Sequence, residues 1–204
     1  MDGAIEKLAA LFEEFPGIGR RQSKRFVYFL LHKNKAFSKD LTEKIEALKQ
    51  EVSQCEECFR FFPKEKDHVL CSTCRERSSS TQVLIVEKDS DFNTIEKAGI
   101  YKGKYFILGG FIFDNEKKKS FARVDQLIQS VEQKLQNKKL DELIFALSLS
   151  PEGEYTRIRL QNILREKFPE LSFSTLGRGL SSGVELEYSD SETLKYAFQS
   201  RLPQ

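Results

Sequence analysis

The sequence has no apolar run long enough to cross a membrane, which takes about 18 or more consecutive apolar residues. Its most apolar stretches, FVYFLL (26–31) and YFILGGFIF (105–113), are much shorter and have the size of buried core segments. The first residues, MDGAIEK, also lack the basic-then-apolar pattern of a signal peptide. We therefore expect a soluble, cytoplasmic protein.

The chain also has little net charge. Its 33 basic and 31 acidic residues give +2 at pH 7, so the total does not indicate a nucleic-acid-binding protein. Any such function must depend on how the charges are distributed locally. The length of 204 residues allows one or two compact units plus small modules.

All four cysteines lie within twenty residues, as Cys55-x2-Cys58 and Cys71-x2-Cys74 separated by twelve residues. Without an export signal, this clustering favours a metal over disulfides. Two such pairs present four thiolates tetrahedrally, which suits a single structural Zn²⁺ and leaves no open position for catalysis. His68 could replace one thiolate, and four reduced thiols without metal are the other alternative, but the spacing favours the four-cysteine site.

The first part of the chain is predicted to be helical. Apolar residues at helical spacing predict helices over 4–13 and 20–33, separated by PGIG at 16–19, and a third helix over about 38–52. Ser38 is the predicted N-cap of the third helix. The apolar residues expected inside this helix are Leu41, Ile45 and Leu48.

After a polar linker at 75–81, the hydrophobic period changes. Strands are predicted over 82–87, 104–110, 141–149 and 171–176, and helices over 91–99, 121–136 and 154–168. Strands that alternate with helices indicate a parallel sheet covered on its faces, hence a mixed α/β fold. A Gly-rich tail from 177 ends in a capped helix that starts near Ser191.

The PGIG segment with its flanking helices resembles a helix-hairpin-helix. Gly17 and Gly19 would let the backbone approach a phosphate, and the N–H groups at the start of the second helix would point at it. Such contacts are independent of base sequence. The alternative is a plain helical turn with a solvated basic face. The candidate basic side chains follow directly: Arg20, Arg21, Lys24 and Arg25.

Three carboxylates follow predicted strands: Glu87 after the first, and Glu152 and Glu154 after the third. Strand ends of an open α/β sheet are the expected place for a site, and paired carboxylates there can hold Mg²⁺. This arrangement resembles a Toprim domain, whose catalytic members carry D-x-D-x-E-G-E. The two aspartate positions are Ser148 and Ser150 here. The resemblance therefore implies a metal-enzyme scaffold without its principal ligands, and we expect no enzymatic activity.

Five stretches in order along the chain carry a resemblance to a known family: FPGIGRRQSKRFVYFLL, CEEC…CSTCRERSSSTQVLIVE, IEKAGIYKGKYFILGG, PEGEYT and GRGLSSGVELEYSDSETLKYAFQSR. This ordered set resembles the bacterial recombination protein RecR family. The resemblance implies a non-enzymatic mediator of recombinational repair in the bacterial cytoplasm, near the nucleoid. It implies ring-like homotetramers that encircle DNA and act with RecO and RecF to load recombinase on gapped DNA.

The same resemblance assigns roles to parts of the chain. It implies that Arg21 and Arg25 face DNA, and that Glu87, Glu152 and Glu154 lie where RecO binds. The expected layout is a helix-hairpin-helix domain (1–53), a four-cysteine zinc finger (54–78), a Toprim domain (79–175) and a C-terminal tail with oligomer contacts (176–204).

The sequence departs from the family pattern in two places. A Ser-Pro…Gly loop is usual after LGG, and this chain has FIFDNEKKKSF (111–121). Ala-Thr-Ala usually follows EGE, and this chain has Tyr155-Thr156-Arg157. The first change affects whatever the loop contacts, and the second alters the surface beside the expected partner site.

Two other functions compete with a DNA-clamping repair mediator. One is a Mg²⁺-dependent Toprim nuclease that uses Glu87, Glu152 and Glu154, against which Ser148 and Ser150 argue. The other is a zinc-stapled interaction module that never contacts DNA. A cleavage assay and a salt-dependent DNA titration separate the three.

Overall fold

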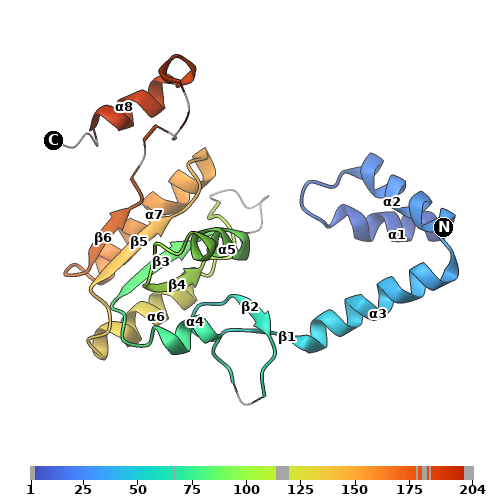
Figure 1. Ribbon diagram of the computed structural model, residues 1–204, viewed down its shortest axis with the longest axis horizontal. Coiled ribbons are helices and arrows are strands. Elements are labelled where there is room, and N and C mark those ends of the chain that lie inside the picture. Colours follow the sequence, from blue (N-terminus) through green and yellow to red (C-terminus); the bar gives the residue numbers. More distant parts are fainter. Residues whose placement is uncertain are drawn as a thin grey trace. The chain divides into compact units, whose positions relative to one another are not determined.

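The computed structural model describes residues 3–66, 68–113, 120–177, 179–180, 183 and 185–199. The chain divides into two compact units, Met1–Ser53 and Gln54–Gln204. Figure 1 gives the order of the helices and strands along the chain. Among the described residues, no helix is both long and apolar enough to cross a bilayer.

The N-terminal unit is helical, as predicted. It consists of α1 (Ala4–Glu13), α2 (Arg20–His32) and α3 (Lys35–Glu51), and α1 packs against α2 (Figure 1). Between α1 and α2 lie the buried side chains of Ala9 and Val27, and the rings of Phe12 and Phe26 meet edge to face at 5.6 Å.

Two details of this unit differ from the prediction. Ser38 is not the N-cap of α3, because Asn34 precedes the helix and its side chain accepts a hydrogen bond from the Phe37 backbone N–H at 2.9 Å. The apolar stripe of α3 is also not inside, since no described residue of this helix is buried. Its exposed side chains are Phe37, Leu41, Ile45 and Leu48.

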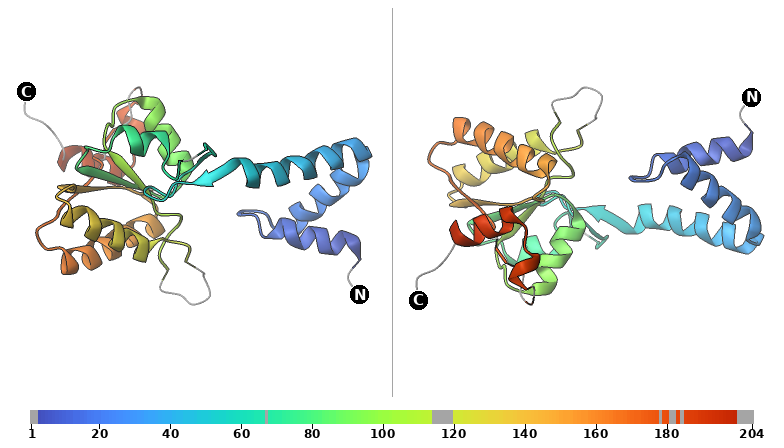
Figure 2. Two further views of the ribbon diagram at one scale, coloured as in Figure 1. Left: turned by 90° about the horizontal axis from the view of Figure 1, so that it is seen from below. Right: turned by 90° about the horizontal axis from the view of Figure 1, so that it is seen from above.

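The second unit is built on a four-stranded parallel sheet, which confirms the predicted mixed α/β class. The order across the sheet is β4-β3-β5-β6. Helices α6 and α7 cover one face and α5 the other (Figure 2). The bounds are β3 (Gln82–Val86), α5 (Asp89–Ala98), β4 (Lys104–Ile107), α6 (Val124–Gln136), β5 (Glu142–Ala146), α7 (Pro151–Lys167) and β6 (Ser172–Thr175).

Both faces of the sheet are buried, as expected when helices cover a parallel sheet on each side. Alternate residues of β3 serve different cores: Val83 and Ile85 face α6 and α7, and Leu84 and Val86 face the opposite side. All four are at most 4% exposed. The continuous apolar runs that predicted these strands follow from this double coverage.

The cysteine module shares a core with this second face of the sheet. It contains β1 (Val52–Gln54), β2 (Phe61–Pro63) and α4 (Ser72–Glu76). All four cysteines belong to one buried cluster with side chains of β3, β4 and α5. The Ile107 N–H also donates to the Cys58 carbonyl at 2.8 Å. The module is therefore anchored to the sheet through its four cysteines.

The polar linker predicted over 75–81 is not a free connection. Its first two residues end α4, and Arg77 is held on the body of the unit. The Arg77 guanidinium donates to both carboxylate oxygens of Glu96 at 2.9 Å and to the Gly103 carbonyl at 3.0 Å. These bonds fix the end of the module beside the sheet. Residues 77–81 still connect α4 to β3, so the prediction of a linker differs from the structure only at the two residues that belong to α4.

The C-terminal segment carries a 3₁₀ turn, η1 (Leu186–Tyr188), and the helix α8 (Ser191–Gln199). The Asp190 carboxylate accepts a hydrogen bond from the Thr193 N–H at 2.9 Å. This is the geometry of a helix N-cap and confirms the predicted capped helix near Ser191. The prediction of oligomer contacts in the tail concerns residues that lie in part outside those described.

Candidate functional site

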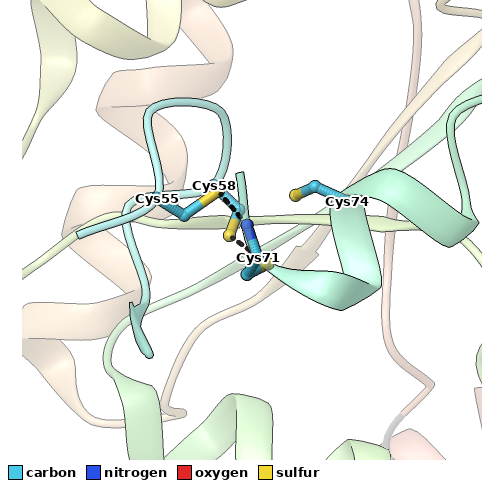
Figure 3. A group of neighbouring side chains, drawn as sticks. All are labelled: Cys55, Cys58, Cys71 and Cys74. Carbon is cyan, nitrogen blue, oxygen red and sulfur yellow. Dashed lines mark hydrogen bonds between the residues drawn. The ribbon is translucent and has the colours of Figure 1, made fainter. Parts of the chain in front are cut away.

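The four cysteines converge on one point. Cys55 and Cys58 come from the turn after β1, Cys71 is the N-cap residue of α4, and Cys74 lies on that helix (Figure 3). Their sulfur atoms all lie within 4.8 Å of one another, and each residue is at most 2% exposed. Of the described His, Cys, Asp and Glu side chains, only these four are grouped closely enough to hold a metal ion together.

This arrangement fits a tetrahedral metal–thiolate site. The Sγ atoms of Cys58 and Cys71 are 3.7 Å apart. A tetrahedron with metal–sulfur bonds of about 2.3 Å places its sulfurs about 3.8 Å apart. The Cys71 backbone N–H points at Cys55 Sγ, 3.4 Å away, as suits a charged sulfur (Figure 3). The donor set and its spacing therefore suit a structural Zn²⁺.

The pKa values of the thiols show that the four sulfur atoms interact strongly with one another. Hydrogen bonds with Cys58, Cys71 and Cys74 lower the pKa of Cys55, whereas hydrogen bonds with the other three raise the pKa of Cys74. A thiolate at one position thus keeps a neighbour protonated. All four sulfurs can be charged at once only with a cation between them.

Glu57, between the first two cysteines, forms a partly buried charge cluster that the sequence did not reveal. Its Oε1 atom is 3.0 Å from Lys104 Nζ on β4 and 3.1 Å from Lys134 Nζ on α6. Burial opposes the charge of Glu57, but the two ammonium groups outweigh burial and lower its pKa. The cluster joins the cysteine turn to a strand and a helix that follow much later in the sequence.

Two of the three predicted strand-end carboxylates lie together at the carboxyl edge of the sheet, and the third does not. Glu87, after β3, and Glu154, in the first turn of α7, both line a hollow of about 430 Å³. Glu152 is exposed and does not line the hollow. Burial raises the pKa of Glu87, and nearby Asp91 raises it further against the opposing effect of Lys88.

The two serines at the aspartate positions, Ser148 and Ser150, form hydrogen bonds at the start of α7. Their hydroxyl oxygens are 2.8 Å apart, and Ser150 Oγ accepts from the Gly153 N–H at 3.2 Å as the N-cap of α7. Helix α7 begins at Pro151, so Glu152-Gly153-Glu154 is its first turn and not a separate turn before residue 154. A Cβ on Gly153 would be 2.0 Å from the Ser148 carbonyl oxygen, so only glycine fits.

Arg157 pairs with the predicted partner-binding residue Glu154. Its Nε atom is 3.1 and 3.2 Å from the two carboxylate oxygens, and its Nη2 atom is 2.5 Å from Oε1. Gln161 Oε1 accepts from the remaining Nη1 at 2.8 Å. The spacing of three residues on a helix was the only sequence signal for this pair.

The hairpin between α1 and α2 has the features expected of a phosphate site. Gly17 has a φ of +79°, which favours glycine. Gly19 has an extended backbone, and among the described residues a Cβ there would meet nothing within 4 Å. No side chain caps the N-terminus of α2, and this helix has no acid in its first turn.

The basic side chains of α2 differ in their surroundings. Arg20, Arg21 and Arg25 are exposed, and within the described residues none of them has a carboxylate at ion-pair distance. Lys24 is partly covered and lies 3.9 Å from Glu6 on α1. The three arginines therefore give α2 a positive surface, to which Lys24 contributes less.

Comparisons with known proteins agree with this combination of modules. A family model described as "Toprim domain" matches residues 81–173, and one described as "RecR, C-terminal" matches residues 179–201. A protein of Amoebophilus asiaticus named "Recombination protein RecR" is 32% identical over 203 residues, which cover 99% of this chain and 95% of that protein. The chain belongs to the RecR family. Relatives with the same name from Flavobacterium johnsoniae and Dehalococcoides mccartyi are 34% and 30% identical, over 98% of this chain and 93% and 94% of theirs.

Membership of the RecR family gives this chain a role in recombination and repair. Proteins of the RecR family act in recombination as mediators and not as enzymes, and this chain belongs to that family although it contains a Toprim domain. The serines at positions 148 and 150 agree with this assignment, because each is committed to the start of α7.

Proposed function

We propose that this protein is a DNA-binding mediator of recombinational repair that forms a ring-like homotetramer on DNA and acts with RecO and RecF to help load recombinase on gapped DNA. The observation that carries the proposal is the similarity over nearly the whole chain to proteins named for recombination. The features of each module support one part of this function.

The four cysteines hold one structural Zn²⁺. The tetrahedral sulfur spacing and nearly complete burial support zinc, and four protein ligands leave no position for a substrate or water. When bound, the ion supplies structural stability and no chemistry. It holds the turn before β2 and the helix α4 against the sheet.

The hairpin of the N-terminal unit binds DNA phosphates. Gly17 and Gly19 allow the backbone close to a phosphate, and the uncapped N-terminus of α2 supplies N–H donors to it. Arg20, Arg21 and Arg25 add positive charge beside the phosphate site. Lys24 contributes less, because Glu6 partly neutralises it. Because these contacts involve only phosphates, binding is independent of base sequence.

The edge of the Toprim sheet binds a basic surface of RecO. Glu87 and Glu154 line the hollow there, and Glu152 is exposed one residue away from its lining. Charge complementarity of this kind steers association and fixes the orientation of partners. Replacement of these acids by glutamine is expected to weaken the partner complex and to leave the fold intact.

A nuclease function is disfavoured, and this can be tested directly. Purified protein incubated with plasmid and Mg²⁺ or Mn²⁺ is expected to show no nicking above the level of the Glu152→Gln variant. The physical reason is that Glu87, Glu152 and Glu154 do not gather as a metal-binding group, and hydroxyls at 148 and 150 are poor ligands for a hard cation. Cleavage that needs the divalent ion and is lost in Glu152→Gln would make the protein a nuclease.

The oligomeric state is expected to depend on the apolar stripe of α3. We expect light scattering to give the molar mass of a tetramer for wild-type protein and a smaller molar mass for Leu41→Asp/Ile45→Asp protein. These side chains are 38% and 52% exposed, and a charge there cannot be buried against another subunit. Thr42→Asp/Lys49→Asp, on the exposed polar side of the same helix, is the control and should remain tetrameric. A wild-type protein that is monomeric at working concentration contradicts the proposal.

A further inference from the structure

The hollow at the carboxyl edge of the sheet combines apolar walls with an excess of carboxylates. Apolar side chains of α5, β5 and the following segments line it, among them Ile95, Phe145 and Leu147. Leu149 and Leu176 also line it and are 66% and 52% exposed. Its charged residues are three acids and two bases, namely Glu87, Asp91, Glu154, Lys88 and Arg157.

The two basic residues, Lys88 and Arg157, differ in exposure and in the strength of their ion pairs. Lys88 is 61% exposed, and its Nζ is 4.0 Å from Glu87, so solvent screens this pair. Arg157 and Glu154 are 21% and 33% exposed and share a two-pronged hydrogen-bonded pair. Gln161 fixes the far side of the guanidinium at 2.8 Å. A fork of this kind is stronger and more directional than a single contact.

We propose that Arg157 is a specificity-determining residue that occupies Glu154 and acts as a built-in competitor for the cation of the partner. This inference rests on the proposed partner site and names what that site takes. The favoured occupant is a protein segment with an arginine or lysine side chain next to apolar residues. Its cation pairs with Glu87 and Glu154, and its apolar residues contact the exposed leucines at the rim.

This arrangement selects between partners by a difference in affinity. A segment with a single basic residue can pair with Glu87 but must displace Arg157 to reach Glu154. A segment with two basic residues, or with an arginine that forms its own fork, compensates better for that displacement. Arg157 thus lowers the affinity of the site for every basic partner. The decrease is largest for partners with a single charge or with a cation that cannot form a two-pronged pair.

The test measures the affinity of RecO from the same organism by calorimetry with three forms of the full-length protein. The Arg157→Ala form is expected to bind roughly two- to five-fold more tightly than wild type, the upper part of the range expected when one partly exposed ion pair no longer competes. The control is Arg159→Ala, which removes the same charge from an exposed position of the same helix. It is expected to bind within about two-fold of wild type, since an exposed charge contributes little.

A double-mutant cycle shows whether the effect passes through Glu154. In a Glu154→Gln background, Arg157→Ala should no longer tighten binding. An Arg157→Ala effect that persists there, or weaker binding of Arg157→Ala, overturns the inference. If Glu87→Gln and Glu154→Gln both bind RecO as wild type does, the partner site itself is wrong.

A second measurement tests the pair without any partner. In the free protein, the Arg157 Nε–H should give a protected nitrogen–proton NMR signal that exchanges fast in Glu154→Ala, because both of its acceptors are lost. An Nε–H signal that is unprotected in wild-type protein overturns the competitor role, whatever RecO does.

Discussion

Cys58→Ser protein is expected to lose its zinc and, with it, much of the stability of the sheet-containing unit. A serine hydroxyl does not ionise near neutral pH, so it cannot supply the charge of a thiolate ligand. Structural zinc contributes roughly 10–16 kcal/mol to small modules, and the whole stability of a domain is only about 5–15 kcal/mol. Loss of most of that contribution should make the protein insoluble or partly unfolded.

The structure extends this expectation beyond the cysteine module. Cys58 is 1% exposed and lies in the same buried cluster as Leu84 of β3 and Tyr105 of β4. The loss of the metal would therefore disturb one whole face of the sheet. The thermal unfolding midpoint of the entire unit should fall, together with the protection of the β3 and β4 amides from hydrogen exchange.

Elemental analysis and thermal unfolding are the measurements for this prediction. Wild-type protein purified without chelators should contain stoichiometric zinc, and Cys58→Ser protein should not. Ser72→Ala is the matched control, because Ser72 is exposed and lies between Cys71 and Cys74 without offering a sulfur. Cys58→Ser protein with full zinc content and an unchanged midpoint would contradict the proposed metal site.

The sheet and the cysteine site could be predicted because their signals are local. Strand β3 is an apolar run whose two faces are both covered, so its observed bounds, Gln82–Val86, match the predicted run at 82–87. The spacing of the two cysteine pairs is that expected of a four-thiolate metal site. The common core of cysteines and sheet could not be predicted, because Phe62, Leu84 and Tyr105 come together only through tertiary packing.

The errors in the helical part have a similar physical cause. Asn34, and not the predicted Ser38, caps α3. Both side chains can accept the capping hydrogen bond, so the residue at which the helical backbone begins determines which of them is the N-cap. The stripe with Leu41 and Ile45 has the period of a buried face, but periodicity does not say whether the partner surface belongs to the same chain. An apolar face can equally await another subunit.

At the candidate sites, the sequence located residues but not their partners. Glu87 and Glu154 do line one hollow, whereas Glu152 does not, because helix residues two positions apart lie on nearly opposite sides of the helix. The fork between Arg157 and Glu154 depends on side-chain rotamers, which no spacing rule determines. Lys104 and Lys134 meet Glu57 only because the chain folds β4 and α6 beside the cysteine turn.

Simultaneous replacement of Arg21 and Arg25 by alanine is expected to weaken DNA binding strongly. These residues lie one helical turn apart on α2, both are exposed, and no carboxylate among the described residues is at ion-pair distance from either. In a ring, several copies act on one duplex, so each substitution removes several contacts together. The affinity should fall on the order of tenfold or more at ~0.1 M salt.

The salt dependence identifies the kind of contact that is lost. Each phosphate contact removed should make the slope of log affinity against log salt shallower by about 0.9 on B-form DNA. The loss should be almost equal for duplexes of unrelated sequence, because phosphate contacts carry no base information. Thermal stability should change little, since neither side chain is buried.

The control separates the position of the charge from its amount. Lys39→Ala/Lys44→Ala removes the same two positive charges from the same unit, but both lysines lie on α3 and pair with acids, at 3.6 Å from Glu43 and 3.2 Å from Asp40. This variant should keep most of the affinity and the slope. If it binds as weakly as the arginine variant, total charge and not the hairpin governs binding. If the arginine variant instead keeps wild-type affinity and slope, the basic side of α2 is only a solvated surface and DNA binds elsewhere.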